Sequence, residues 1–210
     1  MIKFSLGFAE ERGLAKLAKV TDGVLKSVNV RVTRYEKIGG GFVTICFIGD
    51  LASVKHGIEL AAAMGIKTAL IASPGPVVLA LLGLNQSPQT GITISEQRGR
   101  SDYPAEAIGM IETRGFVPMV MALDAMEKAA HIKFMGYDTL GEGLVTAAVY
   151  GDISSVKHSL EAGEMAAGRA GEFVSAELIS KPQLDMFRTL PKIEGIEIDR
   201  PWALGEGQES

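Results

Sequence analysis

Few residues of this chain have the types and spacing that catalysis requires. His56 and His158 each follow Ser-Val-Lys on a predicted helix with no second histidine or acid at ligand spacing, which favours solvated histidines over metal ligands. The only cysteine, Cys46, lies within an apolar stretch, which favours a small buried side chain. Glu10 and Glu112 are better interpreted as partners of backbone groups or neighbouring arginines than as an acid–base pair. No nucleophile, base and orienting group occur together, so we predict no catalytic residue, no metal and no cofactor.

The most distinctive stretch is a glycine-rich segment that occurs twice. Residues 35–44 read Tyr-Glu-Lys-Ile-Gly-Gly-Gly-Phe-Val-Thr, and residues 137–146 read Tyr-Asp-Thr-Leu-Gly-Glu-Gly-Leu-Val-Thr. Glycine adopts positive φ readily, so each run predicts a tight turn. The first run is not a phosphate-binding loop, because no Lys-Ser or Lys-Thr follows it and a strand comes next. On spacing alone, two hairpin turns with solvated charges are the favoured interpretation.

The whole chain is built on this repeat. Matching residues lie 102 positions apart, beginning with Gly7 and Gly109. Towards the end of each copy the separation rises to 108, as between Pro74 and Pro182, so the second copy has about six extra residues before its last strand. A period this long exceeds that of a solenoid repeat and indicates two tandem domains. The predicted boundaries are a first domain over residues 1–84, a linker over 85–104, a second domain over 105–190 and a C-terminal extension over 191–210.

The same order of elements is predicted in both copies. In the first copy, strands are expected over 3–10, 28–34, 42–48 and 67–72, and helices over 14–27, 51–64 (with Asp50 as the N-cap) and 77–82. His131 is placed on a strand, and further short strands are expected over 91–95 and 193–198. Each copy is therefore expected to be an α+β unit, an antiparallel sheet with flanking helices. The two copies are expected to pack side by side about a pseudo-twofold or pseudo-sixfold axis.

Composition narrows the range of partners. The 210 residues carry a formal net charge of −4, which provides no basic field for nucleic acid or an acidic membrane. Residues 68–84 form the longest apolar run, but Pro74 and Pro76 interrupt it, so no membrane span is expected. A lone cysteine excludes an internal disulfide framework and suits the reducing cytosol. The N-terminal sequence has no signal-peptide layout, so we expect a cytoplasmic globular protein.

The second copy also carries a recognisable series of motifs. Residues 107–115 read Ala-Ile-Gly-Met-Ile-Glu-Thr-Arg-Gly, and the series continues through residues 122–132 and the second glycine segment to Ile-Ser-Lys-Pro at 179–182. This series closely resembles the bacterial microcompartment shell domain, and the first copy resembles it more loosely over the same span. The chain is therefore similar to tandem-domain shell proteins of the unpermuted type found in propanediol-utilisation shells. The resemblance implies a homotrimer that imitates a hexamer and tiles into the flat facets of a protein shell.

The resemblance also implies a role for the glycine turns, which in this family surround the symmetry axis and line a pore. The implied pore-lining residues are Lys37, Gly39, Gly40, Thr139, Gly141 and Glu142. In a trimer, three Glu142 carboxylates would favour cations, and three Lys37 ammonium groups could offset them. One tandem relative holds an iron–sulfur cluster through a cysteine in this turn. Glycines stand at the corresponding positions here, so no cluster is expected.

Three lysines are implied as contacts at the edge of a tile. Lys26 and Lys128 fall at the ends of the first helices, where relatives pack a lysine against the neighbouring tile. Lys181 falls where relatives often carry a basic edge residue, whereas the first copy has Ser73 there. Without the resemblance, helix-terminal lysines that interact with the helix dipole would be the better interpretation of Lys26 and Lys128.

The sequence therefore predicts a structural shell protein that is not an enzyme. The expected partners are copies of itself, other shell proteins, encapsulated enzymes and small metabolites that cross the pore. One alternative is a trimeric regulatory module that binds small molecules, which a lone trimer would reveal by saturable ligand binding. An enzyme with its site between the copies is disfavoured, because the differences between the copies are confined to the turns and form no cluster of His, Asp or Cys.

Overall fold

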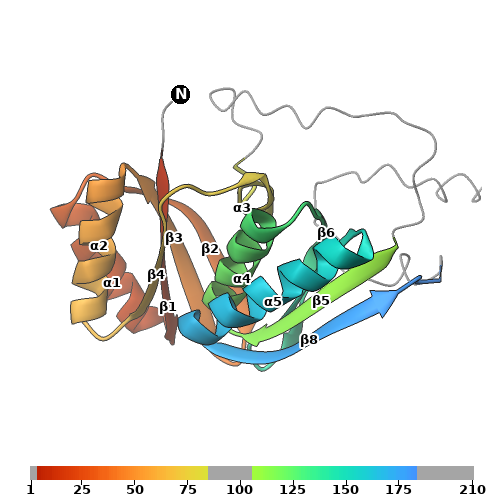
Figure 1. Cartoon of the computed structure of the whole chain (residues 1–210). Coiled ribbons are helices and arrows are strands. Elements are labelled where there is room, and N and C mark those ends of the chain that lie inside the picture. Colours follow the sequence, from red (N-terminus) through yellow and green to blue (C-terminus); the bar gives the residue numbers. More distant parts are fainter. Residues whose placement is uncertain (1–3, 85–105, 184–210) are drawn as a thin grey trace, which may run out of the picture.

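The computed structural model describes residues 4–84 and 106–183 and shows two copies of one α+β unit (Figure 1). The first copy consists of β1 (Ser5–Arg12), α1 (Leu14–Ser27), β2 (Arg31–Gly39), β3 (Phe42–Gly49), α2 (Leu51–Ala63), β4 (Lys67–Ile71) and α3 (Pro76–Leu81). The second consists of β5 (Ala107–Arg114), α4 (Phe116–Ala129), β6 (Lys133–Gly141), β7 (Leu144–Gly151), α5 (Ile153–Ala170) and β8 (Glu172–Ser180). Both sheets are antiparallel, with the orders β2-β3-β1-β4 and β6-β7-β5-β8, so the predicted fold class is confirmed.

The two copies match down to their irregularities. In the first sheet the β2–β3 pairing shifts between Val32 and Arg34, and the β6–β7 pairing shifts between Phe134 and Gly136. A second shift precedes each glycine turn, at Lys37/Gly39 and at Thr139/Gly141. Such bulges bend a strand and increase its twist. The duplicated sequence therefore reproduces the same curved hairpin in both halves of the molecule.

Local chemistry explains where the helices begin. Asp50 and Asp152 precede α2 and α5, and each side chain accepts a hydrogen bond from the amide three residues on, at 2.9 Å in both cases. This is the standard N-cap arrangement. These hydrogen bonds lower the pKa of both exposed carboxyl groups, with the Ser53 amide the largest cause for Asp50 and the Ser155 hydroxyl for Asp152. Helices α1 and α4 begin instead after Gly13 and Gly115, which have positive φ and provide no side-chain cap.

The structure departs from the sequence predictions in several places. Strand β2 begins at Arg31, three residues later than predicted, because Val28 ends α1 and leads into a short extended connection. The strand also runs further than predicted, as far as Gly39 in the glycine turn. His131 lies in the connection before β6 and not on a strand as predicted. The extra residues of the second copy lengthen its second helix, since α5 has 18 residues and α2 has 13. The strands predicted over 91–95 and 193–198, and a second short helix after β8, lie outside the described residues.

Helix α4 joins the two copies into one core. Figure 1 shows α1 and α2 on one side of the first sheet and α4 on the other. One core cluster includes Val20, Val43 and Phe47 and belongs to the first copy alone. The larger cluster combines Phe8 and Ile38 of the first copy with Phe116 and other residues of α4. The first sheet is therefore covered on both faces, by its own helices and by the second copy.

Candidate functional site

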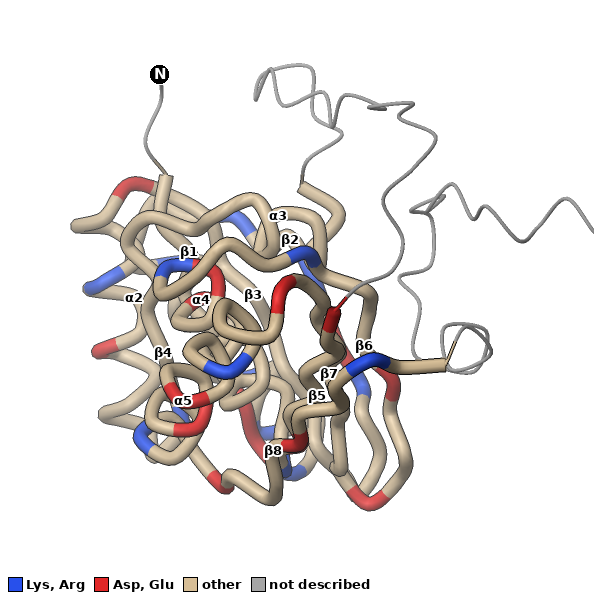
Figure 2. Tube along the Cα trace, turned by 45° about the vertical axis from the view of Figure 1, so that its right-hand side comes forward, with Lys and Arg blue, Asp and Glu red and all other residues tan. Residues whose placement is uncertain are grey.

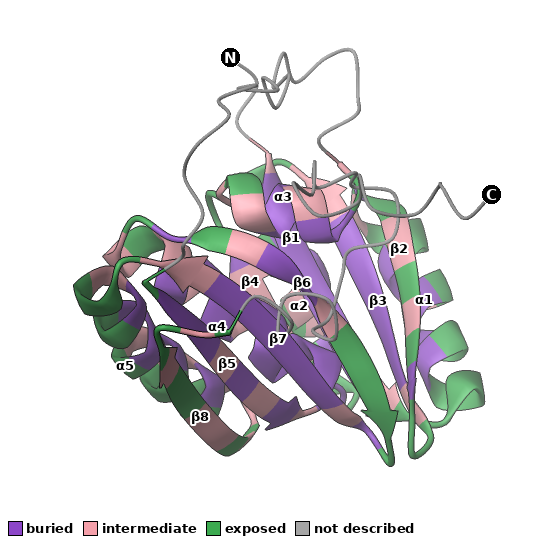
Figure 3. Ribbon diagram, turned by 90° about the vertical axis from the view of Figure 1, so that its right-hand side faces the viewer, coloured by how far each residue is buried: buried purple, intermediate pink, exposed green. Residues whose placement is uncertain are grey.

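The two glycine turns lie against each other although they are far apart in the sequence. Figure 3 shows the tips of the β2–β3 and β6–β7 hairpins at the same end of the molecule. A Cβ atom on Gly40 would lie 2.5 Å from the carbonyl carbon of Glu142, and one on Gly39 would lie 3.5 Å from the Cα of Gly141. The backbones therefore touch, and only glycine fits at Gly40. The structure brings together four of the six residues predicted to line a pore: Gly39, Gly40, Gly141 and Glu142.

Backbone conformation gives a second reason for glycine in these turns. Gly39, Gly40 and Gly41 have φ values of 83°, 58° and 79°. In the second turn Gly141 and Gly143 also have positive φ, at 92° and 82°. Glycine enters this region without the penalty that a Cβ atom imposes. The prediction of tight turns with positive φ is confirmed.

The Arg-Gly motif that ends the first strand of each copy holds its turn in place. The amide of Gly13 donates to the carbonyl of Gly41 at 2.9 Å, and the amide of Gly115 donates to the carbonyl of Gly143 at the same distance. In the second copy Arg114 also donates from Nη1 to the carbonyl of Glu142 at 3.0 Å. Each turn is thus fixed to the start of a helix, which makes its position reproducible.

The polar and charged side chains at the two turns face solvent. Lys37, Thr139 and Glu142 are all exposed in the single chain. Glu142 adopts a positive φ of 50°, unusual for a residue with a side chain, and the Arg114 bond is made to its backbone carbonyl. Its carboxylate is therefore not needed for that contact. Figure 2 shows acidic and basic residues dispersed over both copies in this view, without a single basic face.

The sequence did not reveal that Glu10 joins the two copies. This carboxylate is buried, and its Oε2 accepts hydrogen bonds from the amides of Phe116 and Val117 at 2.6 and 3.2 Å. These amides lie in the first turn of α4, where a helix leaves its N–H groups without internal partners. Oε2 also accepts from the Thr44 hydroxyl at 2.8 Å. Burial raises the pKa of Glu10, and these hydrogen bonds oppose the shift without cancelling it.

A second acid crosses the boundary in the opposite direction. Glu127 of α4 accepts through Oε1 from the amide of Val77 at 2.8 Å, near the start of α3. Its pKa is raised chiefly by burial. Each copy therefore supplies a carboxylate to a helix N-terminus of the other. The prediction that Glu10 bonds to backbone is confirmed, but its neighbour Arg12 stacks on the ring of Phe42 instead, 4.6 Å from the centroid.

The remaining candidates for chemistry lie apart from the turns. Cys46 is buried on β3, as predicted, and desolvation raises the pKa of its thiol to about 12. His56 and His158 are exposed on α2 and α5. One statement about them needs correction: an acid does lie near His158, since Glu161 Oε2 is 3.9 Å from its Nδ1. Among residues 4–84 and 106–183, no group of three or more His, Cys, Asp or Glu side chains is placed to hold a metal ion.

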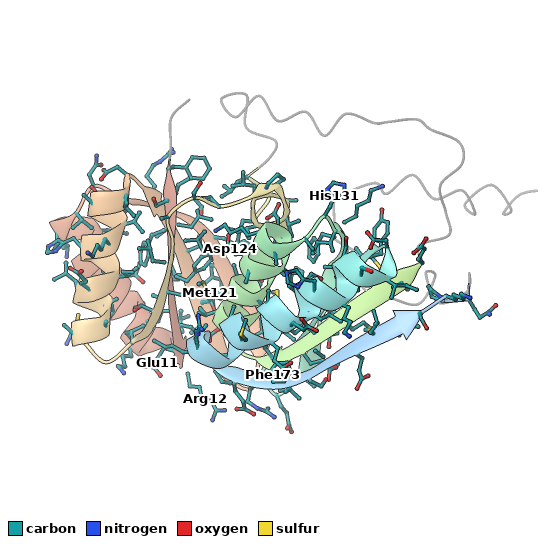
Figure 4. The ribbon with its side chains drawn as sticks, viewed as in Figure 1. Glu11, Arg12, Met121, Asp124, His131 and Phe173 are labelled. Carbon is teal, nitrogen blue, oxygen red and sulfur yellow. The ribbon has the colours of Figure 1, made fainter. Side chains whose placement is uncertain are left out.

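The three lysines predicted at a tile edge are all exposed. Lys26 lies in the last turn of α1 and forms an ion pair with Asp22 at 2.6 Å, and Lys128 repeats this pair with Asp124 at 2.6 Å on α4. Figure 4 shows Asp124 on α4 and His131 just beyond the end of that helix. Lys181 follows β8 with a positive φ of 49°, and its amide donates to the carbonyl of Glu106. Within the described part of the chain, no helix has the length and apolar character needed to span a bilayer.

Comparison with known proteins gives the same division of the chain. The sequence model of the BMC domain family matches residues 5–74 and again residues 107–182. The carboxysome assembly protein CcmO of Synechocystis is 33% identical over 193 residues, which cover 89% of this chain and 64% of that protein. CcmO of Synechococcus elongatus is 32% identical, over 90% of this chain and 69% of the relative. The chain thus spans about two thirds of the length of these relatives.

Shorter relatives and a solved structure agree with this. The bacterial microcompartment shell protein EutM of Salmonella typhimurium is 48% identical over 86 residues, which cover 41% of this chain and 90% of EutM. The crystal structure of a microcompartment protein from Desulfitobacterium hafniense superposes with a TM-score of 0.66 at 21% identity, over 89% of this chain and 99% of that one. The latter similarity supports the fold alone. From the two family matches, the chain belongs to the BMC domain family and carries two such domains in tandem.

Proposed function

We propose that this chain is a structural protein of a bacterial microcompartment shell, in which three copies form one pseudohexameric tile. The family membership and the relatives named as shell or carboxysome assembly proteins support this role. They do not favour the alternative of a regulatory module that binds small molecules. The localisation that follows is the shell of a microcompartment within the cytoplasm, and other shell proteins are the expected neighbours.

The contact between the two glycine turns is the observation that supports the proposal of a pore. Two equivalent turns from one chain lie backbone to backbone at the same end of the molecule, at Gly40 and Glu142. Three chains arranged about an axis would bring six such turns together. Lys37, Gly39, Gly40, Thr139, Gly141 and Glu142 would then line an opening through which small metabolites pass. We assign no catalytic reaction to this pore. Enzymes enclosed by the shell are further expected partners of the chain.

The edges of the tile are assigned to the lysines that end the first helix of each domain. Lys26 and Lys128 are exposed and occupy equivalent positions, so a pseudohexamer would present six such ammonium groups around its rim. A lysine stem can lie along a flat partner while its ammonium group donates to carbonyl oxygens. Lys181 is proposed to add a contact on the second domain only.

The test is assembly into flat layers, observed by electron microscopy of the purified protein. We expect sheets or facets for the wild type, and none for a variant with Lys26→Asp and Lys128→Asp, because six reversed charges would repel their former acceptors. The trimer of this variant should persist in sedimentation velocity experiments. The matched control changes Lys55 and Lys157 to Asp, since these are also exposed and equivalent but lie on α2 and α5. Normal layers from the first variant would show that the edge assignment is wrong, and saturable ligand binding by a lone trimer without any layers would favour the regulatory alternative.

A further inference from the structure

The contact between the two copies joins two different surfaces. The first copy contributes the sheet face that carries Glu10, and the second contributes the N-terminus of α4. A contact between unlike surfaces is heterologous, and it leaves one surface of each kind free at the ends of the pair. In this chain the free surfaces are the sheet face of the second copy and the N-terminus of α1 in the first.

The free sheet face carries an acid equivalent to Glu10. Glu112 accepts a hydrogen bond from Thr146 through Oε1 at 2.9 Å, just as Glu10 accepts from Thr44. Its Oε2 accepts from the Ser175 hydroxyl at 2.9 Å, a partner that Glu10 does not have. The carboxylate is half-buried rather than buried and accepts no backbone amide among the described residues. Since an ionised carboxylate has about four acceptor positions, it can accept further hydrogen bonds.

The apolar surroundings of Glu112 are also uncovered. Ile38 lies in the core between the two copies and is 2% exposed, whereas Leu140, 102 residues later, is 58% exposed. Likewise Phe8 is fully buried, whereas its equivalent Met110 is only partly buried. Figure 3 looks onto this side of the second copy, where β8 and the part of β6 near the turn are exposed or intermediate and most of β5 and β7 is buried. This face has the same strand order as the face that binds α4, but no helix of residues 4–84 or 106–183 lies on it.

The N-terminus of helix α1 is exposed and lacks a capping side chain, unlike that of α4. Its first residue, Leu14, is 51% exposed, whereas the equivalent Phe116 of α4 is 1% exposed. Ala15 is exposed as well, and the N-cap residue Gly13 has no side chain with which to satisfy the amides of the first turn. Among the described residues no side chain accepts hydrogen bonds from the amides of Leu14 and Ala15, the equivalents of the two amides that Glu10 holds.

We infer that Glu112 of one subunit caps α1 of the next, accepting hydrogen bonds from the amides of Leu14 and Ala15 in a second copy of this chain. This contact reproduces between chains the contact that Glu10 makes within one. It rests on the proposed function, because three chains close into a ring only if the operation that relates the two copies is one sixth of a turn. Ser175 holds the carboxylate towards the incoming helix, and Leu14 of that helix covers Leu140 and Met110.

Hydrogen exchange measured by NMR or mass spectrometry tests this contact directly. Amides of the first helical turn have no intrahelical acceptor, so those of Leu14 and Ala15 should exchange rapidly in a free chain. In the assembled protein we expect them to be protected, like those of Phe116 and Val117. The glutamine amide oxygen is an uncharged and weaker acceptor, so Glu112→Gln should reduce the protection of Leu14 and Ala15 while leaving Phe116 and Val117 fully protected. Because charge-assisted hydrogen bonds are lost, this variant should dissociate about tenfold more readily at each interface in a sedimentation dilution series.

A second pair of variants tests the same contact in case the Glu112→Gln variant fails to fold. Leu14→Asp places a negative charge opposite Glu112 at a site that is exposed in the single chain, so the subunit should fold and fail to associate. Leu51→Asp is the matched control, since Leu51 is also the first residue of a helix and is 48% exposed. We expect it to associate normally. Circular dichroism confirms folding of each variant.

The outcomes separate this inference from the proposed function. If the wild type forms trimers while Leu14 and Ala15 exchange as free amides, or if the Glu112→Gln and Leu14→Asp variants associate as the wild type does, the inferred contact is wrong and the tile remains. If the wild type is monomeric at all accessible concentrations, both fail. Loss of association in Leu14→Asp but not in Leu51→Asp, together with reduced protection of the Leu14 and Ala15 amides in Glu112→Gln, would support the contact.

Discussion

Gly40 and Gly41 are neighbours in one turn, yet the structure places different demands on them. Both have positive φ, so alanine at either position should cost about 1–2 kcal/mol in free energy of unfolding. A Cβ atom at Gly41 meets nothing within 4 Å, whereas one at Gly40 would lie 2.5 Å from backbone carbon of Glu142. We therefore expect Gly40→Ala to lose clearly more stability than Gly41→Ala in urea unfolding. Equal losses would show that the two turns can separate without cost.

Single residues were predictable where their neighbours in sequence decide their environment. Cys46 lies in an apolar run, and a buried thiol follows from that alone. The partners of Glu10 could not be predicted in the same way, because the amides of Phe116 and Val117 lie more than a hundred residues away and belong to the other copy. The signal that could have suggested them was the Glu-x-x-Gly spacing before each first helix, which places an acid near an uncapped helix start.

Glu10 links the stability of the α4 junction to pH. Burial raises its folded pKa above the usual value of 4.5. The protonated form therefore contributes stability that is fully present below that value and is lost as the pH rises through the folded pKa. Relative to Glu10→Gln, which does not titrate, we expect the free energy of unfolding of the wild type to fall as the pH is raised from about 4.5. Urea unfolding at a series of pH values measures the difference.

Glu11 provides a control with the opposite sign. The hydrogen bond from Lys16 lowers its pKa, so its ionised form contributes stability that is present above the ordinary value and is lost as the pH falls through the folded pKa. The wild type should therefore lose stability relative to Glu11→Gln on acidification. If Glu10→Gln and Glu11→Gln changed the pH profile in the same direction, burial of Glu10 would not govern its titration.

At the level of elements, hydrophobic periodicity and the repeat were sufficient to predict the order and type of the helices and strands, but not every one of their boundaries. Helices α1 and α2 and strands β3 and β4 lie within a residue or two of the predicted ranges. Strand β2 was placed too early because the alternation of valines from Val28 suggested a strand, whereas the backbone there leaves α1 in an extended connection. Helix α4 is buried over most of its length, because it is covered on two sides, and the sequence analysis did not predict this burial.

The whole molecule was predictable as a duplication, because an offset of 102 residues that holds over most of each copy requires two similar units. The offset says nothing of which surface of one unit meets which surface of the other. That choice depends on small differences, such as Phe116 in place of Leu14 and Pro118 in place of Lys16, which make α4 suitable for burial and α1 suitable for exposure in a single chain. In the proposed trimer, an asymmetric pair of this kind would let successive chains extend into a ring.

The charge of the proposed pore is a property of the whole assembly. Three Glu142 and three Lys37 would give a ring without net charge, so neither cations nor anions should be strongly preferred. Glu142→Gln would leave three positive charges and shift selectivity towards anions, whereas Lys37→Gln would leave three negative charges and shift it towards cations. The Arg114 hydrogen bond to the backbone of Glu142 should survive the first change, so assembly should be unaffected.

Permeation of small ions across a tiled layer measures both shifts in selectivity. These shifts should shrink at high salt, because the screening length falls to about 3 Å at 1 M. Identical selectivity of both variants and the wild type at low salt would remove these two residues from the pore.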